Sequence, residues 1–386
     1  MFEERGLRVC PLCGGEGLEP RYRTAQALSV SSDCRVVHEG VRILQCLSCG
    51  HVGSVMENPQ ALKDLYQAYN LYAESEESDH MVFSPDLGAP KTRTELEMAI
   101  LETLRLPEQG SYLDVGCNKG LMLKAFARRY PHWRVSGYEI SDRYKERLRG
   151  VVQSGDFYTG ALENLSDRFD LITIFHVLEH VSDPGDFLKQ VARLLKPEGI
   201  LMVQVPNVVE NPFDLLIFDH LSHFLPQTLE RILVRSGLSV RRVQRPSVPR
   251  ELTVLCKPSQ GSIAVEYRPE ALCARLKEQS AWLEGFEAKA VELRRSRWLG
   301  VFGTGTGGTW AGGLLEGVVR FFVDESPWKV GQRHLGLLVI HPEKLTAGDD
   351  LLLAIPPQIA PFVERKWIGS GVRFHRCEPM TEKVTS

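Results

Sequence analysis

The stretch Ser111-Tyr-Leu-Asp-Val-Gly-Cys-Asn-Lys-Gly120 indicates the fold more clearly than any other part of the chain. An apolar strand ends near the acid Asp114, and a Gly-x-x-x-Gly turn leads from it into a helix that we expect over 121–130. Glycine lets the backbone approach a ligand closely, and the first turn of a helix presents N–H groups without intrahelical partners. The stretch therefore predicts a small-molecule site at the end of a buried strand.

The residues downstream repeat this alternation of strand and helix. We expect strands over 133–139, 169–175 and 199–205, with helices over 144–148 and 187–195. Such alternation is typical of a parallel, doubly wound sheet with helices on both faces. The predicted fold class is therefore α/β with a Rossmann-like core, and a ligand should bind at the carboxyl ends of its strands.

Two further positions at that edge suit a nucleoside. The next strand ends at Glu139, where a carboxylate can accept hydrogen bonds from both hydroxyls of a ribose. Gly155-Asp156-Phe157 follows an expected third strand and suits the amine and the ring face of adenine. The turn after Asp114 does not have the spacing of the dinucleotide pattern Gly-x-Gly-x-x-Gly.

Four motifs, in order, resemble those of the class I S-adenosylmethionine-dependent methyltransferases. They are Asp-Val-Gly-Cys-Asn-Lys-Gly at 114–120, Gly-Tyr-Glu-Ile-Ser at 137–141, Phe-Asp-Leu-Ile-Thr-Ile-Phe-His-Val-Leu-Glu-His-Val at 169–181 and Leu-Leu-Lys-Pro-Glu-Gly-Ile-Leu-Met-Val at 194–203. The resemblance implies S-adenosylmethionine as cofactor. The cofactor-binding residues that it implies are Asp114, Gly116, Cys117, Asn118, Gly120, Glu139, Asp156, Phe157, Phe175 and His176.

Two Cys-x-x-Cys pairs lie near the N-terminus, Cys10 with Cys13 and Cys46 with Cys49. Each pair aims two thiolates at one point, and four thiolates are the ligands that a tetrahedral Zn²⁺ prefers. A redox Cys-x-x-Cys should precede a helix in a strand–helix–strand unit, and neither pair does. We therefore predict a structural zinc site, with no open position for chemistry.

A second glycine-rich turn, Gly303-Thr-Gly-Thr-Gly-Gly308, follows a short strand, and Asp324 ends the next strand. This order satisfies the dinucleotide-binding pattern. The motif alone predicts an NAD site, and the alternative is a purely structural turn.

The whole arrangement is similar to that of the sugar C-methyltransferases, which act on nucleotide-linked deoxy-keto sugars. The domains that we expect are a zinc module over 1–56, a linker or lid over 57–94, a methyltransferase core over 95–260, a connecting helix over 261–297 and a second α/β domain over 298–386. The resemblance implies that the glycine-rich turn cradles the nucleotide diphosphate of the substrate instead of NAD. The residues that it places at the substrate are Tyr72, Gly303, Gly305, Gly308 and Asp324.

The segment Phe218-Asp-His-Leu-Ser-His-Phe224 carries the candidate catalytic groups. Methylation of a carbon beside a ketone needs a base and a hydrogen-bond donor for the enolate oxygen, and histidine suits either role. The resemblance gives the base role to His220, with Asp219 orienting it, and implies that His180 and His223 also lie at the site.

Some residues depart from the pattern of that family. Family tyrosines are Phe218 and His223 here, a glutamate is shortened to Asp219, and a Gly-Gly-Ser strand start reads Pro249-Arg-Glu-Leu252. O-methylation of a sugar or related metabolite therefore stays open. Two other interpretations also stay open: His220 and His223 have only a packing role, or the protein is a non-catalytic subunit that only binds the cofactor.

The amino-acid composition argues against two classes of binding partner, nucleic acid and anionic membranes. The 386 residues carry 46 Lys and Arg against 49 Asp and Glu, a net charge of −3, so no general basic field exists for nucleic acid or an anionic membrane. No apolar run approaches the roughly 18 residues that span a bilayer, and the N-terminus lacks the apolar stretch of a secretory signal. We expect a cytoplasmic monomer or homodimer that binds a small molecule.

Overall fold

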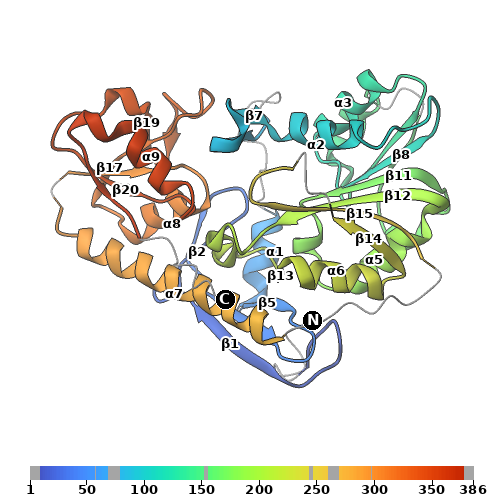
Figure 1. Ribbon diagram of the computed structural model, residues 1–386, viewed down its shortest axis with the longest axis horizontal. Helices are drawn as coiled ribbons and strands as arrows, with labels where there is room; N and C mark the ends of the chain where they lie inside the picture. Colours follow the sequence, from blue (N-terminus) through green and yellow to red (C-terminus); the bar gives the residue numbers. More distant parts are fainter. Residues whose placement is uncertain are drawn as a thin grey trace, which may run out of the picture.

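The computed structural model describes residues 9–56, 58–67, 79–151, 155–242, 247–259, 269–296 and 298–377. It has two α/β lobes with a small β-rich module beneath them, and a long helix that runs from this module along the C-terminal lobe (Figure 1). Within the described residues, no helix is both long enough and apolar enough to cross a membrane.

The larger lobe is built on a seven-stranded sheet with the order β10-β9-β8-β11-β12-β15-β14. Its strands are β8 (Ser111–Val115), β9 (Arg134–Tyr138), β10 (Phe157–Tyr158), β11 (Phe169–Phe175), β12 (Leu195–Pro206), β14 (Leu238–Arg242) and β15 (Glu251–Pro258). The five strands from β10 to β12 are parallel, as predicted, while β15 runs antiparallel to both of its neighbours.

Helices cover both faces of this sheet, and each face has its own apolar core. On one face lie α2 (Arg93–Glu102), α3 (Leu121–Arg129) and the short α4 (Lys145–Leu148), whose buried side chains include Ile100, Leu123 and Phe126. On the other lie α5 (Pro184–Arg193) and α6 (Pro226–Arg235), which bury Leu188, Leu229 and Leu233. Layers of this kind confirm the predicted α/β class.

The N-terminal module is a four-stranded sheet that borrows one strand from the larger lobe. Its order is β1-β4-β5-β13, formed by β1 (Leu18–Arg23), β4 (Val41–Cys46), β5 (Val52–Met56) and β13 (Ser222–His223). A small hairpin of β2 (Ser29–Val30) and β3 (Val36–Val37) extends from it. The module is therefore not closed within residues 1–56, because a segment of the larger lobe completes its sheet.

The expected linker begins with a helix, α1 (Pro59–Gln67), and later forms the hairpin of β6 (Met81–Val82) and β7 (Lys91–Thr92). Tyr72, which we expected at the substrate, lies outside the described residues.

The C-terminal lobe contains a separate six-stranded sheet with the order β18-β19-β17-β16-β20-β21. Its elements are β16 (Leu299–Phe302), α8 (Thr306–Leu314), β17 (Val319–Val323), β18 (Arg333–His334), β19 (Leu337–Ile340), β20 (Asp350–Leu353), α9 (Ala360–Trp367) and β21 (Arg373–His375). All pairs are parallel except β18 with β19.

One apolar core joins the three parts. The connecting helix α7 (Pro269–Leu293) buries a stripe of leucines and Phe286 in it, together with side chains from β1, β4 and α8. Phe213 stands at its centre, with ring centroids 5.2 Å from Trp282, 5.3 Å from Phe286 and 6.4 Å from Trp310. A fully buried aromatic contact of this size fixes the C-terminal lobe against the rest.

Candidate active site

The turn after β8 has the backbone of a ligand cradle. Gly116 and Gly120 have left-handed φ angles of +78° and +77°, and Asn118 has φ +51°. A Cβ atom on Gly116 would lie 2.3 Å from Val177 Cγ2, and one on Gly120 would lie 2.3 Å from Leu148 Cδ2. Only glycine fits these two positions, so the turn keeps its backbone open at the carboxyl edge of the sheet.

Glu139 follows β9 beside this turn. Its Oε2 accepts a hydrogen bond from Asn118 N–H at 3.1 Å, and its Oε1 accepts one from Ile140 N–H at 3.0 Å. The carboxylate also accepts a hydrogen bond from the Ser141 backbone, and since a carboxylate has about four acceptor positions it can still accept one from a ribose hydroxyl. The Ile140 side chain is 79% exposed at this point, an apolar surface that the flat face of a base would cover. These groups fit the adenosyl part of S-adenosylmethionine.

Two other residues of the cofactor motif are directed into the protein. Asp114 is buried and accepts a hydrogen bond from Thr173 Oγ1 at 2.7 Å, and burial raises the pKa of its carboxyl to about 7. The Cys117 thiol packs near Gly137, and burial raises its pKa above the usual range. Both side chains pack beneath the turn and support its backbone. Because a buried thiol with a raised pKa stays protonated, Cys117 is not a nucleophile.

Asp156 does not lie where we expected it. The third strand, β10, begins after Asp156 rather than ending before Gly155. The Asp156 carboxylate pairs with Arg134, the first residue of β9, whereas Glu139 follows the last residue of the same strand. The expectation that Asp156 binds the adenine amine is corrected, because its side chain is directed toward Arg134 at the start of β9, away from Glu139. Phe157 packs partly buried against the core.

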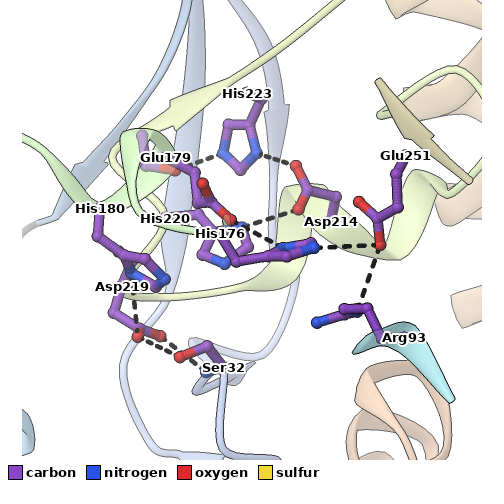
Figure 2. Close-up of polar contacts among 11 residues, drawn as sticks. Ser32, Arg93, His176, Glu179, His180, Asp214, Asp219, His220, His223 and Glu251 are labelled. Atoms are coloured by element: carbon purple, nitrogen blue, oxygen red, sulfur yellow. Dashed lines mark hydrogen bonds and ion pairs between the residues drawn. The ribbon is translucent and has the colours of Figure 1, made fainter. Parts of the chain in front are cut away.

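A group of buried imidazoles and carboxylates lies beyond the end of β11 (Figure 2). Asp214 stands at its centre, in the turn η5 (Pro212–Leu216), and is 1% exposed. Its Oδ1 lies 2.8 Å from His220 Nδ1, and its Oδ2 lies 2.6 Å from His223 Nδ1. The orienting partner of His220 is therefore Asp214, and the role that we expected for Asp219 is corrected.

Asp219 has a different set of partners. Its carboxylate accepts hydrogen bonds from Ser32 N–H at 2.8 Å and from Ser32 Oγ at 2.5 Å. Its backbone carbonyl accepts one from His180 Nδ1 at 2.9 Å. The proton of His180 is therefore on Nδ1, which leaves Nε2 as an acceptor. The ring of His180 meets that of His220 edge to face, with centroids 4.7 Å apart.

His223 lies too deep to meet a substrate. It is 1% exposed, and its Nε2 lies 2.8 Å from Ser54 Oγ while its Nδ1 is bound to Asp214. With both ring nitrogens engaged, no atom remains for catalysis. The expected catalytic role of His223 is corrected to a structural one.

Phe175 is the last residue of β11, and His176 follows it on the side of Glu251. The His176 backbone has φ +54°, and its ring lies 3.2 Å from Glu179 Oε1 and 3.5 Å from Glu251 Oε1. Glu251 also pairs with Arg93 at 3.3 Å. His176 is thus held among acids between the cofactor turn and the histidine group.

His220 and His180 differ in protonation at neutral pH, because their surroundings shift their pKa values in opposite directions. Burial opposes the charged form of His220, but the Asp214 carboxylate outweighs it and raises the His220 pKa to about 9. Burial also opposes ionisation of Asp214, yet His220 and His223 hold its pKa below the ordinary value. Burial and repulsion by His220 lower the pKa of His180. At neutral pH His220 is therefore an imidazolium and His180 a neutral imidazole.

The N-terminal module holds these histidines in position. β13 pairs antiparallel with β5, with Ser222 opposite Gly53 and His223 opposite Val52. In the same sheet, His51 Nε2 lies 3.0 Å from Ser222 Oγ, and His51 Nδ1 lies 3.9 Å from Cys10 Sγ. The same small sheet thus connects the cysteine cluster with the histidine group.

The four predicted zinc ligands converge. The sulfur atoms of Cys10 and Cys49 are 3.6 Å apart, as are those of Cys13 and Cys46, and all four lie within 4.8 Å of one another. Thiolates about 2.3 Å from a tetrahedral Zn²⁺ have sulfur atoms roughly 3.8 Å apart, whereas a disulfide is close to 2 Å. The donor set and its spacing fit zinc.

The glycine-rich turn of the C-terminal lobe packs against η5. A Cβ atom on Gly307 would lie 2.7 Å from the Phe213 ring, so the turn is adjacent to the segment that carries Asp214. Gly303 has φ +102°, and a Cβ on Gly308 would lie 1.9 Å from Gly303 O, whereas Gly305 faces open space.

Asp324 is engaged within the protein. Its Oδ2 accepts hydrogen bonds from Thr304 N–H at 3.2 Å and Thr304 Oγ1 at 2.6 Å, and its Oδ1 accepts one from Ser326 N–H at 2.9 Å. The carboxylate that a dinucleotide would need for its ribose instead holds the turn in shape.

Four residues of the site were not singled out from the sequence: Asp214, Glu179, Ile140 and Ser32. Asp214 had a visible signal, because it is the one acid in the apolar run Pro212-Phe-Asp-Leu-Leu-Ile217. A carboxylate in such a run must find a partner when it is buried, and histidines six and nine positions on provide two.

Comparison with known proteins agrees with this geometry. Residues 91–243 match a family model described as a methyltransferase domain. The chain is 35% identical over 103 residues to a ubiquinone biosynthesis O-methyltransferase of Idiomarina loihiensis, an alignment that covers 25% of this chain and 42% of that protein. It is 30% identical over 132 residues to a trans-aconitate 2-methyltransferase of an Enterobacter strain, covering 34% and 52%.

A solved S-adenosylmethionine-dependent methyltransferase from Clostridium acetobutylicum aligns with 14% identity and a TM-score of 0.36, over 43% of this chain and 90% of its own. The chain spans about half the length, or less, of the two curated relatives named above. Residues 91–243 form a methyltransferase domain, and S-adenosylmethionine is the cofactor of that class.

Replacing Glu139 by glutamine tests the cofactor turn. The change keeps the shape of the side chain but removes the charge that would accept a ribose hydroxyl, which is worth about 1.5–3 kcal/mol. Calorimetric titration with S-adenosylhomocysteine should show a dissociation constant raised roughly 10- to 100-fold. Glu146→Gln, whose side chain is 77% exposed, is the control and should bind like the wild type. Equal affinity in Glu139→Gln would contradict the site.

The Asp214–His220 pair makes stability depend on pH. The folded-state pKa of His220, about 9, exceeds its ordinary value of 6.5, so its stabilisation is complete below that ordinary value and is lost as the pH rises toward 9. Over this interval the unfolding free energy of the wild type should fall, relative to His220→Gln, by up to about 3 kcal/mol. Urea unfolding at a series of pH values measures it. The exposed His132→Gln is the control, and a difference that does not change with pH would refute the pairing.

Proposed function

We propose that this protein transfers the methyl group of S-adenosylmethionine to the carbon beside the ketone of a nucleotide-linked deoxy-keto sugar. The observation that carries the proposal is that both glycine-rich turns contact segments next to the histidine group: Gly116 faces Val177, and Gly307 faces Phe213. The cofactor turn ends β8, the glycine-rich turn of the C-terminal lobe packs on Phe213, and the imidazoles of His180 and His220 lie among the segments that follow β11 and η5. A substrate with a nucleotide at one end and a keto sugar at the other suits this distribution of groups.

The two imidazoles suit the two demands of the reaction. His180 is neutral, its Nδ1–H is held by the Asp219 carbonyl, and its Nε2 can accept a proton. His220 is protonated through Asp214, and its Nε2–H can donate to an oxygen that gains negative charge. We had assigned the base to His220 from the sequence. The charge of Asp214 makes His220 the better donor, and the base role passes to His180.

In the proposed step, the C–H bond beside the ketone breaks and its proton moves to His180 Nε2. The electron pair forms an enolate, whose oxygen accepts a hydrogen bond from His220. When bound, the cofactor would supply a methyl group on a positively charged sulfur, transferred in line to the enolate carbon as the sulfur–methyl bond breaks, with the uncharged thioether S-adenosylhomocysteine as leaving group. The chain's own task is to hold the two groups and to exclude water, which the buried position of His220 favours.

O-methylation is the second candidate, favoured by the names of curated relatives, which include ubiquinone biosynthesis O-methyltransferases. The same His180 would then take the proton of a hydroxyl, and no C–H bond would break. The two candidates differ in one measurable event.

Exchange of the substrate's own hydrogen decides between them. The full chain is incubated in D₂O with nucleoside-diphosphate keto sugars but without the methyl donor, and deuterium is measured by mass spectrometry. C-methylation predicts deuterium at the carbon beside the ketone, lost in His180→Ala and retained in the exposed His132→Ala. Methyl transfer to hydroxyl substrates without such exchange would instead establish O-methylation. Cofactor binding without methyl transfer to any of these substrates would reject both.

A further inference from the structure

We propose that Glu179, His180 and His220 form a binding site for a divalent transition-metal ion, distinct from the four-cysteine cluster. The site shares its two imidazoles with the proposed function, but binding of an ion is measured without any turnover. The two proposals can therefore fail separately.

The three side chains surround one point. A ligand atom from each lies within 4.8 Å of the ligand atoms of the other two. Glu179 and His180 belong to the turn η4 (Leu178–His180) after β11, and His220 comes from the segment before β13. Figure 2 shows the three side chains close together, with His180 and His220 bonded to different partners. Two imidazoles and a carboxylate are a common ligand set for divalent transition metals.

Glu179 supplies an acceptor atom with nothing bound to it. The residue is 1% exposed, and its Oε1 is 3.2 Å from His176 Nδ1. Its Oε2 is buried and has no hydrogen-bond partner among the described residues. A buried carboxylate oxygen without a partner costs free energy, and a cation beside it would remove that cost.

The imidazoles are oriented as metal ligands are. His180 Nδ1 donates to the Asp219 carbonyl at 2.9 Å, and His220 Nδ1 lies 2.8 Å from the Asp214 carboxylate. Metal-binding histidines usually donate one ring N–H to a carbonyl or carboxylate, which fixes the ring and leaves the other nitrogen for the ion. In both residues the nitrogen that remains is Nε2. On His220 this nitrogen carries a proton at neutral pH, and the ion displaces that proton to the solvent when it binds.

The surrounding charge also favours a cation. Glu179, Asp214 and Asp219 are three carboxylates, each 1% exposed or less. Buried negative charge needs compensation. Since an ion with two positive charges takes the place of one proton on His220, it adds one net positive charge to this group. Since two of three ligands are nitrogen, the site should prefer Zn²⁺, Co²⁺ or Ni²⁺ to Mg²⁺ or Ca²⁺.

Cobalt(II) is a suitable probe because its visible spectrum reports its ligands. The full chain, purified with zinc in the cysteine cluster, is titrated with Co²⁺ by calorimetry and absorption spectroscopy. We expect one Co²⁺ per chain to bind without the strong thiolate charge-transfer band that cobalt in a cysteine site would show. Because the ion occupies the Nε2 atoms that the proposed proton transfer needs, methyl transfer should decrease as the site fills.

Glu179→Gln removes one ligand and should weaken Co²⁺ binding at least about tenfold. Glu198→Gln, whose side chain is 91% exposed, is the matched control and should bind as the wild type does. His180→Ala, at a side chain 23% exposed, is a second variant if Glu179→Gln does not fold, and it should weaken binding similarly. Binding of S-adenosylhomocysteine verifies the fold of each variant.

Two results would overturn the site: no Co²⁺ bound beyond the cysteine cluster, or equal affinity in the wild type and in folded Glu179→Gln and His180→Ala. If instead Co²⁺ binds as expected while the metal-free protein methylates no substrate, the metal site stands and the proposed function fails.

Discussion

The pairing of β13 with β5 is the contact on which the candidate active site depends. β13 is only two residues long, Ser222 and His223, and it lies at the edge of a sheet whose other three strands belong to the N-terminal module. So short a strand has little stability of its own and takes its conformation from its partner. The geometry of His220 and His223 is therefore set by a module that is remote from them in the chain.

That dependence gives the cysteine cluster a role beyond local folding. Cys46 ends β4, and its N–H donates to His51 O at 2.8 Å just before β5 begins. A metal ion bound by the four cysteines would hold the turn between β4 and β5 in one conformation, and this turn sets the position of β5. Ser54 of β5 and Ser32 of the β2–β3 hairpin then reach His223 and Asp219. Through these contacts the N-terminal module supports the segment that carries the candidate catalytic histidines.

The sequence could predict those parts of the fold and of the site that are determined by residues close together in the chain. The run of apolar residues before Asp114, the glycine turn and the spacing to Glu139 predict a parallel sheet with a nucleoside site, because each strand and its turn are contiguous in the chain. The two cysteine pairs predict their own meeting although 32 residues separate them, because each local Cys-x-x-Cys turn supplies two of the four ligands that a tetrahedral Zn²⁺ needs.

What the sequence could not predict depends on partners distant in the chain. The place of Asp156 depends on where the two-residue strand β10 begins, and so short a strand leaves almost no periodic signal. The roles of Asp214, Asp219 and His223 depend on which carboxylate meets which imidazole. Ser32, Ser54 and the strand β5 determine these pairings, and all of them lie more than 150 residues earlier in the chain. Pairings of this kind are tertiary, and no motif encodes them.

Hydrogen exchange of backbone amides in the wild type and in Cys46→Ser measures whether the N-terminal module holds the histidine segment in place. The amide of Ser54, which donates to Leu221 O at 3.2 Å, and the amides of Ser222 and His223 report the pairing of β5 with β13. We expect these amides to lose protection in the variant while those of β8 keep theirs. If Ser222 and His223 stay as protected in Cys46→Ser as in the wild type, the histidine segment holds its own shape, and the N-terminal module does not support the site.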